Sequence, residues 1–436
     1  MSGAGAALFG FAVMLLLIAL RMPVGLAMLA VGSAGYVWFV GWAPFLSYMK
    51  TTPYHLFANY TLSVIPLFIL MGAFAERSGL STDMFQAASR LFGQRRGGLA
   101  MAVIGACTGF GAICGSSVAT TATFGRAALP ELTRYGYDAG FSTATIAAGG
   151  TLGILIPPSV ILVVYAISTE QNIAKLFQAA LIPGLLAAIF YCVVIAWIAS
   201  RNPRLAPLAA ARLGGRSLFT VWPAILVAVT VLGGIYGGIF TPTEGAAVGA
   251  VAMLLIGVLR GSLGLTDIKT SMLQTAETTA MIFAILLGAE VFNAFLALSQ
   301  LPTQAAEAIA GSGAPPYAIL AFLLAFYIVL GAVMDELAMI LLTLPVFFPV
   351  VSGLDFGLPA EEVAIWFGIL VLIVVGVGLI APPIGLNVFV ISALAKDVPI
   401  MATYRAVVPF IAADLVRLLL VMVFPAMSLW LVRALT

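Results

Sequence analysis

Apolar segments long enough to cross a lipid bilayer recur from one end of this sequence to the other. A helix needs about 20 apolar residues to cross the hydrocarbon core. Charged residues make up only 8% of the 436 residues and hydrophobic residues 63%, whereas soluble domains carry about 25% charged residues. The sequence therefore predicts an all-α polytopic membrane protein. The expected spans are residues 5–21, 23–46, 54–76, 139–168, 174–200, 218–240, 243–260, 271–298, 363–395 and 399–434, about ten in number.

Two further apolar stretches, residues 98–134 and 315–351, are too long for one helix and are interrupted in the middle. The first interruption is GFGAICGSS at 109–117, and the second is GAVMDE at 331–336. A half-length helix of about 12 residues rises only about 18 Å, so it cannot cross alone. We therefore predict two re-entrant helical hairpins, each returning to the side of the membrane from which it starts.

The distribution of basic residues supports this layout. Lysine and arginine are enriched in cytoplasmic loops. With both hairpins re-entrant, 15 of the 19 basic residues fall in the cytoplasm and both termini fall outside. If either hairpin is treated as a single crossing, the excess of basic residues in the cytoplasm disappears. The cytoplasmic set is Arg21, Arg77, Arg90, Arg95, Arg96, Arg126, Arg134, Arg201, Arg204, Arg212, Arg216, Arg260, Lys269, Lys396 and Arg405, leaving Lys50, Lys175 and Arg433 outside and Arg417 in the last span.

A Gly-x-x-x-Pro-Pro break occurs twice, at Pro157-Pro158 and at Pro382-Pro383, a spacing of 382 − 157 = 225 residues. In the predicted layout the first broken helix runs inward to outward and the second runs the opposite way. The chain thus reads as an inverted-topology repeat, in which each half carries a hairpin followed by a broken helix. We expect N-terminal scaffold helices at 1–97, a first repeat core at 98–200, central scaffold and linking helices at 201–298, and a second repeat core at 299–436.

Proline removes a backbone donor and displaces the carbonyl four residues earlier, and membranes tolerate this only where the backbone is buried in protein or lines a cavity. Paired breaks in corresponding positions of two repeats indicate a transporter's binding site. Freed carbonyls can bind a sodium ion, and half-helix N-termini can face an anion. The small and polar residues at the breaks and hairpin tips are Gly149, Gly150, Thr151, Gly153, Ser159, Asn387, Ser116, Ser117, Thr120, Thr121 and Asp335.

Other polar residues in the apolar segments admit structural interpretations. Asp414 and Arg417 are three residues apart on one helix and are expected to pair with each other. Glu244 either caps the helix that starts after Pro242 or joins a polar cluster, and Glu336, next to Asp335, has the alternative of facing water. A single histidine, His55, cannot form a metal site alone, and Cys107, Cys114 and Cys192 indicate neither disulfides nor a metal spacing.

Several motifs resemble the large membrane subunit, DctM type, of tripartite ATP-independent periplasmic (TRAP) transporters. They are GAICGSSVATTATFGRAALPEL, GGTLGILIPPSVILVVYAISTEQNIAKLFQAALIPGLL, GIFTPTEGAAVGA, VMDELAMILLTLPVFFP and GLIAPPIGLNVFV, and the likeness covers essentially the whole chain. The resemblance implies a sodium-driven importer of carboxylates in a bacterial inner membrane, with no cofactor and no enzymatic activity. It also implies two partners, a small four-helix membrane subunit (DctQ type) and a periplasmic binding protein, and an elevator movement of a hairpin-bearing domain.

The resemblance also implies site residues. One sodium site is expected at Gly115, Ser116 and Ser117 with the backbone of Gly150, Thr151 and Gly153; the other is expected at Asp335 with the backbone around Gly378, Ala381 and Pro383. Substrate is expected between the tips, with Thr120, Arg126, Pro157, Ser159 and Asn387 as candidate contacts. Two positions depart from the family pattern: Ala381 replaces a frequent threonine, so that this site must rely on backbone oxygen or Asn387, and Cys114 replaces a frequent serine.

Alternatives remain at the level of the sequence. Arg126 is equally well explained as a substrate partner and as a cytoplasmic anchor. A stand-alone sodium/carboxylate symporter of the same superfamily would share the hairpins and broken helices but would need no binding protein. An intramembrane enzyme would need a metal cluster, an Asp-rich motif or a Ser-His pair at depth, which this sequence does not offer.

Overall fold

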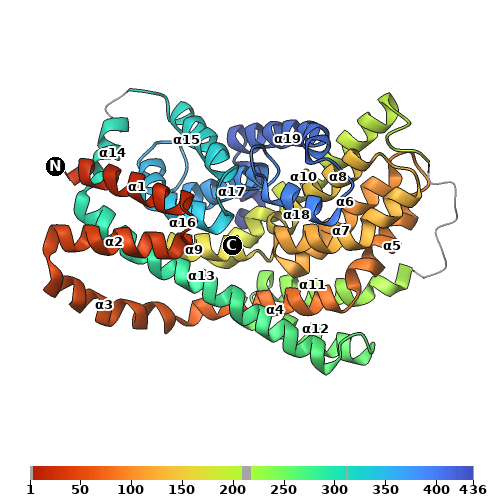
Figure 1. Cartoon of the computed structure of the whole chain (residues 1–436), viewed down its shortest axis with the longest axis horizontal. Helices are drawn as coiled ribbons and strands as arrows, with labels where there is room; N and C mark the ends of the chain where they lie inside the picture. The colour runs from red at the N-terminus through yellow and green to blue at the C-terminus, as the bar shows by residue number, and fades with distance from the viewer. Residues whose placement is uncertain (1–2, 209–217, 311–312, 436) are drawn as a thin grey trace.

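The computed structural model describes residues 3–208, 218–310 and 313–435, and these form helices joined by short loops with no strand among them (Figure 1). The prediction of an all-α protein is therefore confirmed; Arg212 and Arg216 lie outside the described residues. The helices are α1 (Gly3–Ala19), α2 (Val24–Val40), α3 (Trp42–Phe57), η1 (Tyr60–Ser63), α4 (Val64–Arg77), α5 (Leu80–Phe92), α6 (Gly98–Cys114), α7 (Ser117–Arg134), α8 (Ala139–Leu155), α9 (Val160–Ser168), α10 (Ile173–Arg201), η2 (Leu218–Val221), α11 (Trp222–Tyr236), α12 (Pro242–Leu259), α13 (Leu265–Ser299), α14 (Leu301–Ala310), α15 (Pro316–Gly331), α16 (Glu336–Ser352), α17 (Ala360–Gly378), α18 (Leu386–Leu394), α19 (Ile400–Val423) and α20 (Ala426–Leu435).

Six helices of the described chain are long and apolar enough to cross a membrane, or seven if the bent pair α8 and α9 counts as one span. The six are η1 with α4, α10, α12, α13, α17 and α19. Three further segments that the sequence predicts as spans, α1, α2 and α11, are apolar helices of 15 to 17 residues. The composition and these helices together indicate a multi-pass membrane protein.

Some predicted helix boundaries are wrong, because glycine and proline end helices that hydropathy alone joins. The predicted span 23–46 ends at Val40, since Gly41 has a φ of +87° and starts a separate helix, α3. The predicted span 399–434 is divided into α19 and α20 at Pro425. The short helices α5 and α14 precede the two hairpins and were not predicted, because neither is apolar enough or long enough to read as a span.

Both predicted hairpins are antiparallel helix pairs whose two ends meet, but their helices have 16 to 18 residues and are longer than the half-length helices that the sequence predicts. In the first, α6 and α7, the backbone N–H of Leu99 donates to the Tyr137 hydroxyl at 3.3 Å. In the second, α15 and α16, the rings of Tyr317 and Phe356 lie 5.4 Å apart, edge to face. Each hairpin therefore turns back to the end of the bundle from which it starts. Re-entry into a bilayer stays a prediction.

The two broken helices run in opposite directions. The start of α8 lies beside the start of α19, where the hydroxyls of Thr143 and Thr403 are 2.7 Å apart. The start of α17 lies beside the start of α10, where Lys175 Nζ is 2.6 Å from a carboxylate oxygen of Glu361. The pair α8 and α9 thus starts at the end of the bundle where α17 and α18 finish. This arrangement is the one that an inverted repeat requires.

The chain segments that carry the predicted cytoplasmic arginines meet at one end of the bundle. Arg260, at the end of α12, forms an ion pair with Asp83 of α5. Arg77, at the end of α4, lies 4.0 Å from Asp267 at the start of α13. Gly97, before the first hairpin, donates its backbone N–H to the Ala206 carbonyl. The tertiary contacts therefore agree with the grouping that the basic residues predict.

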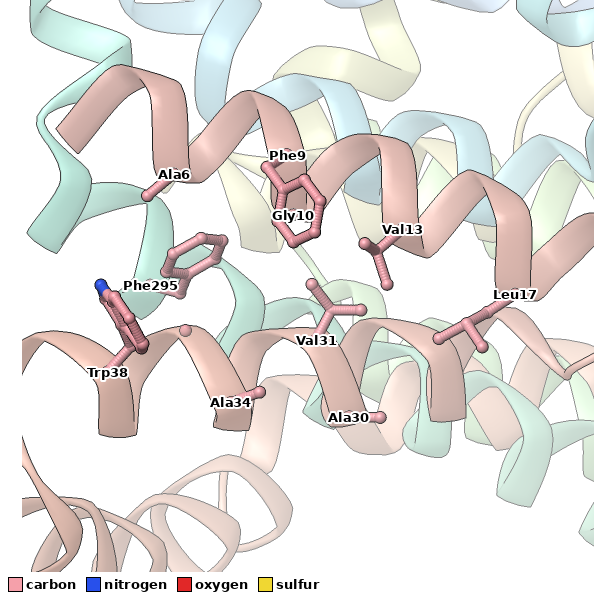
Figure 2. Close-up of a pocket in the computed structure, with 11 residues that line it drawn as sticks. Ala6, Phe9, Gly10, Val13, Leu17, Ala30, Val31, Ala34, Trp38 and Phe295 are labelled. Carbon is pink, nitrogen blue, oxygen red and sulfur yellow. The ribbon is translucent and has the colours of Figure 1, made fainter. Parts of the chain in front are cut away.

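Long helices form a framework along one side of the hairpins and broken helices. In Figure 1, α13 runs diagonally under the molecule, with α2 alongside it and α4 and α12 at its far end. Figure 2 shows the Phe295 ring of α13 between α1 and α2, at an apolar cavity of about 380 Å³. A side-chain carbon at Gly35 would collide with that ring, and one at Gly10 would lie 2.8 Å from it. Small residues here allow the three helices to approach closely.

Candidate functional site

The tip of the first hairpin rests on the first Pro-Pro break. Gly115 turns the chain between α6 and α7 with a φ of +65°, which a side chain disfavours. A side-chain carbon there would also fall 2.7 Å from the Pro158 carbonyl oxygen. Ser116 then caps α7, because its Oγ accepts a hydrogen bond from the Ala119 N–H at 3.3 Å. The N-termini of α7 and α9 consequently lie at the same junction.

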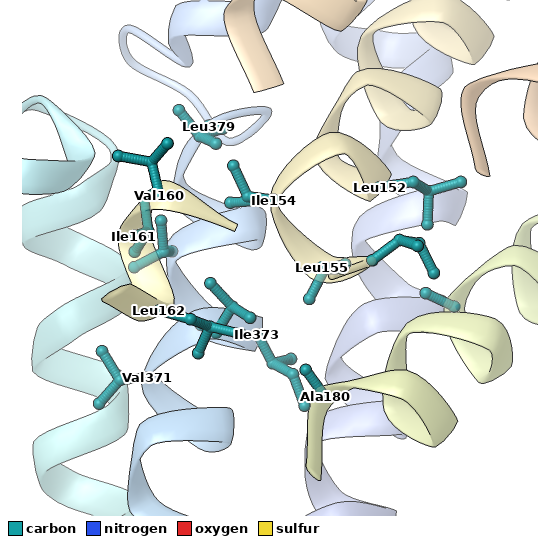
Figure 3. Close-up of a cluster of buried hydrophobic side chains, with 14 of the residues drawn as sticks. Leu152, Ile154, Leu155, Val160, Ile161, Leu162, Ala180, Val371, Ile373 and Leu379 are labelled. Atoms are coloured by element: carbon teal, nitrogen blue, oxygen red, sulfur yellow. The ribbon is translucent and has the colours of Figure 1, made fainter. Parts of the chain in front are cut away.

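The break itself is buried among apolar side chains. Helix α8 ends at Leu155, and α9 begins at Val160 with Ser159 as its N-cap, whose Oγ accepts from the Leu162 N–H at 3.5 Å. Because Pro157 has no N–H, the Gly153 carbonyl four residues earlier loses its helical partner. Figure 3 shows leucine, isoleucine and valine side chains on both sides of this break, with those of α17 beside them. A freed carbonyl in such surroundings needs a polar partner.

Hydroxyl and amide groups from both halves of the chain gather at this first junction. Asn387 of α18 is fully buried; its Nδ2 donates to Ser117 Oγ at 2.7 Å and to the Ala147 carbonyl at 3.1 Å. Thr121 lies beside them, and its buried Oγ1 has no hydrogen-bond partner among the described residues. A side-chain carbon at Gly150 would collide with that Oγ1. Glycine is therefore required at this position to make room for the cluster.

Gly153 and Thr120 complete the first junction. Thr120 Oγ1 donates to the Ser116 carbonyl at 2.7 Å. A side-chain carbon at Gly153 would lie 2.6 Å from that same carbonyl oxygen. The structure therefore brings Ser116 of the predicted first sodium site against Gly153, whereas Gly150 faces Thr121 and Asn387. Thr151 takes part only through its backbone, because its hydroxyl lies 3.0 Å from the Tyr191 hydroxyl on the other side of α8.

The second junction repeats this arrangement with different chemistry. Asp335 caps α16 where Ser116 caps α7, and its Oδ2 accepts from the N–H groups of Leu337 and Ala338 at 3.2 and 3.4 Å. The hairpin packs on the second break through Gly378, where a side-chain carbon would lie 2.6 Å from the Gly331 backbone. The ends of α15 and α17 therefore meet, and the Ile384 N–H donates to the Ala332 carbonyl at 3.2 Å across this junction.

The second break is more exposed than the first. Pro382 and Pro383 are exposed, and Ala381 is 8% exposed. Tyr404, which the sequence analysis did not select, donates its hydroxyl to the Pro383 carbonyl at 3.0 Å. Asn387 extends toward the first junction, so Asp335 has no side-chain amide from α18 at this break. Both Pro-Pro peptide bonds are cis.

Two of the polar residues considered in the sequence analysis, Arg126 and Glu336, lie in surroundings other than the two sodium sites predicted from the sequence. Arg126 lies nine residues beyond Ser117 along α7, about 14 Å at a helical rise, where it forms an ion pair with Glu76 of α4. Glu336 is partly buried, and its Oε2 is buried without a hydrogen-bond partner among the described residues.

The remaining polar residues of the apolar segments have structural roles. Asp414 and Arg417 form a fully buried pair, 2.8 Å apart, as predicted. Glu244 forms a capping box with Thr241, accepting from its N–H at 2.8 Å, so the capping alternative is confirmed. No group of three or more His, Cys, Asp or Glu side chains suited to a metal ion occurs in the part of the chain that the structure describes.

Tyr191 is the functional-site neighbour that sequence reasoning missed most clearly. Its hydroxyl connects Thr151 of α8 to Asp414 of α19, donating to the Asp414 Oδ2 at 2.6 Å. A sequence signal existed, because a tyrosine inside a long apolar span needs a partner for its hydroxyl. The identity of that partner required the tertiary structure.

Comparison with known proteins places these features in a family. A family described as "Tripartite ATP-independent periplasmic transporter, DctM component" matches residues 11–427. The C4-dicarboxylate TRAP transporter large permease protein DctM of Pseudomonas aeruginosa is 38% identical over 376 residues, covering 85% of this chain and 86% of that protein. The isethionate TRAP transporter permease protein DctMQ of Oleidesulfovibrio alaskensis is 32% identical, covering 97% of this chain and 65% of that protein.

A solved structure shares the fold. The Alcanivorax borkumensis YdaH transporter, described as having an unusual topology, aligns with a TM-score of 0.66 at 16% identity, covering 98% of this chain and 99% of that one. At this identity the likeness concerns the fold alone. The family match covers nearly the whole chain, and the helices and the relatives together indicate a multi-pass inner-membrane permease. The chain belongs to the DctM family, the large permease subunits of TRAP transporters.

Proposed function

We propose that this chain is the translocating subunit of a sodium-coupled importer of an organic anion, with a carboxylate as the substrate class. The observation that carries the proposal is the pair of junctions. At each one, a hairpin tip meets a Pro-Pro break. At the first, the N-termini of α7 and α9 also come together with the carbonyl that Pro157 leaves free. Helix N-termini favour anions, and freed carbonyls favour cations.

Sodium is proposed to bind at both junctions. At the first, the oxygen atoms available are the Ser116 carbonyl, the hydroxyls of Ser117 and Thr121, and the backbone of Gly150, Thr151 and Gly153. Hard cations prefer oxygen ligands of this kind. At the second, the proposed ligands are Asp335 and the backbone around Gly378, Ala381 and Pro383. The unpartnered Thr121 hydroxyl supports the first assignment, since a buried hydroxyl without a partner is costly.

The anion is proposed to bind between the tips, at the N-termini of α7, α9, α16 and α18. Thr120, Pro157, Ser159 and Asn387 are the proposed contacts from the first junction. Arg126, the remaining candidate, lies midway along α7 and pairs with Glu76, outside this site. Sodium binding would order the tips first and so complete the anion site. Relatives named for a C4-dicarboxylate and for isethionate, a sulfonate, share this chain's family, so family membership identifies no individual anion. A carboxylate is proposed because the more similar of these two relatives is named for a C4-dicarboxylate.

The movement proposed is an elevator. The hairpins and broken helices would slide as one body against the framework that contains α2, α4, α12 and α13 (Figure 1). Each positive charge that moves inward with the membrane potential gains about 2.3 kcal/mol per 100 mV. An excess of sodium charge over substrate charge would therefore drive accumulation. Both termini are proposed to lie in the periplasm, because the arginine-rich end of the bundle would face the cytoplasm.

Two partners complete the proposal, a small membrane subunit of the DctQ type and a periplasmic binding protein that delivers the anion. The existence of a relative named DctMQ supports the first. The test is uptake into proteoliposomes that contain this chain and its small subunit, with the binding protein added or omitted and sodium present or replaced by potassium. Uptake that needs both sodium and the binding protein is expected. Uptake by this chain alone would favour the stand-alone symporter, and uptake without sodium would overturn the ion assignment.

A further inference from the structure

A polar cavity of about 540 Å³ lies between α4, α5 and α7, apart from both junctions. Its lining includes Arg77 of α4, Ser81 and Thr82 of α5, and Thr123 and Arg126 of α7. Thr123 is seven residues from Ser116 on the same helix, about 10 Å at a helical rise. The cavity is therefore a separate feature, at the arginine-rich end of the bundle.

Two guanidinium groups reach this cavity with some of their N–H donors not engaged in hydrogen bonds. Arg126 pairs with Glu76 but leaves 55% of its side chain exposed. Arg77 lies 4.0 Å from Asp267, with 32% of its side chain exposed, and donates one hydrogen bond to Gln274. Each guanidinium carries five N–H donors in a planar fork. The lining charges, two arginines against Glu76, leave a net positive cavity that retains free donors.

The N-terminus of α5 adds backbone donors. Gly79, in the left-handed conformation with a φ of +73°, starts the helix without a side-chain cap. The N–H groups of Leu80, Ser81 and Thr82 belong to the first turn of the helix, where no intrahelical carbonyl is available to accept from them. An uncapped helix start carries partial positive charge and attracts anions. By itself this would not define a site.

Thr123 supplies an independent observation that points to a ligand. Its side chain is 4% exposed, it lines the cavity, and its Oγ1 has no hydrogen-bond partner among the described residues. A buried hydroxyl without a partner is unfavourable. An oxyanion in the cavity would accept from the guanidinium groups, and the covered Thr123 hydroxyl would join them after its side chain rotates.

We propose that this cavity is a second oxyanion site, which takes a carboxylate after its release from the hairpin tips. The claim that the bound carboxylate is the transported anion rests on the proposed function. The claim that this cavity binds a carboxylate does not depend on it. Glu76 competes with the incoming anion for Arg126, so the anion binds weakly and exchanges the α4–α7 ion pair for contacts of its own. Weak binding suits a site that an anion must leave.

The experiment uses a thiol placed in the cavity. Thr82→Cys is made in a Cys192→Ser background, since Cys107 and Cys114 are buried, and the full chain is placed in nanodiscs of zwitterionic lipid. Alkylation by a maleimide is timed with increasing succinate, in potassium buffer without sodium. Succinate is expected to slow alkylation, and Arg126→Gln is expected to raise the half-protecting concentration about tenfold, because it removes a charged donor. Arg134→Gln, on the same helix but outside the cavity, is the matched control and should leave protection unchanged.

Several outcomes would overturn the site. One is that succinate does not slow alkylation. Another is that succinate protects the Arg126→Gln and parent chains equally. The third is that alkylation is slowed only in nanodiscs of anionic lipid, without any need for succinate, which would assign the cavity to a lipid headgroup. If the Thr82→Cys chain does not purify, the succinate-dependent thermal shift of the wild-type and Arg126→Gln chains decides the same question. The alkylation experiment contains neither sodium nor an ion gradient. Succinate can therefore protect the thiol even if sodium-driven uptake is not observed, and uptake can be observed even if succinate does not protect. The two proposals are thus tested independently.

Discussion

The buried pair of Asp414 and Arg417 allows a quantitative test of how charges are held inside this bundle. The two side chains are 1% and 0% exposed and lie 2.8 Å apart. Arg417 also donates to the Pro183 carbonyl at 3.2 Å, and Asp414 accepts from Tyr191. Removing one partner leaves an uncompensated buried charge, which costs about 3–5 kcal/mol. Asp414→Leu should lower the free energy of unfolding by about 1 kcal/mol beyond that cost, because the Tyr191 hydroxyl also loses its hydrogen-bond acceptor.

The double substitution Asp414→Leu with Arg417→Met separates the charge from the packing. Replacing a buried ion pair by apolar residues of similar volume is often neutral or stabilising by about 1–4 kcal/mol. We therefore expect the double variant to be more stable than Asp414→Leu alone. The assay is the free energy of reversible unfolding in mixed detergent micelles, taken around a double-mutant cycle. The coupling energy should be about 3 kcal/mol or more.

The exposed pair of Glu131 and Arg134 provides the matched control, since it has the same three-residue spacing but lies 3.7 Å apart with side chains 39% and 73% exposed. Glu131→Gln is expected to change stability by less than about 1 kcal/mol. The reasoning is refuted if Asp414→Leu costs no more than this control. It is also refuted if the double variant loses as much free energy of unfolding as the two single variants lose together.

Three further predictions concern the junctions. Asp335→Ala should weaken the sodium dependence of uptake, and an unchanged sodium titration would argue against the second sodium site. Asn387→Leu should orphan two buried partners and cost about 1–3 kcal/mol for each in unfolding measurements, together with reduced uptake; a variant of full stability would contradict the hydrogen bonds described. Gly153→Ala should abolish uptake, because the added carbon would lie 2.6 Å from the Ser116 carbonyl oxygen. Gly233→Ala, with open space around it, is the control and should transport normally.

The hairpins and broken helices were predictable because their causes are local. Proline lacks an N–H, a half-length apolar segment cannot cross a bilayer, and basic residues collect on one side. Hydropathy failed where a helix ends without a loss of apolarity, as at Gly41 and Pro425. It also failed for α5, whose alternation of polar and apolar residues resembles no spanning segment.

The candidate site was predicted in its residue types and only partly in its partners. Ser116 and Gly153 meet at the first junction as the motifs implied. The sequence offered Asn387 as a substitute ligand at the second break, but the structure places its side chain with Ser117 of the first hairpin, 270 residues away. No local pattern encodes which of two nearby junctions a side chain enters.

By itself, then, the sequence determined the membrane class, the two hairpins, the two breaks and their opposite orientation, since each follows from periodicity, length and the chemistry of single residue types. Only the tertiary structure decided that Tyr191 connects Thr151 to Asp414, that Arg126 pairs with Glu76, and that a cavity forms beside the α5 N-terminus. Those contacts depend on how helices distant in sequence pack, and packing is set by the shapes of many side chains together.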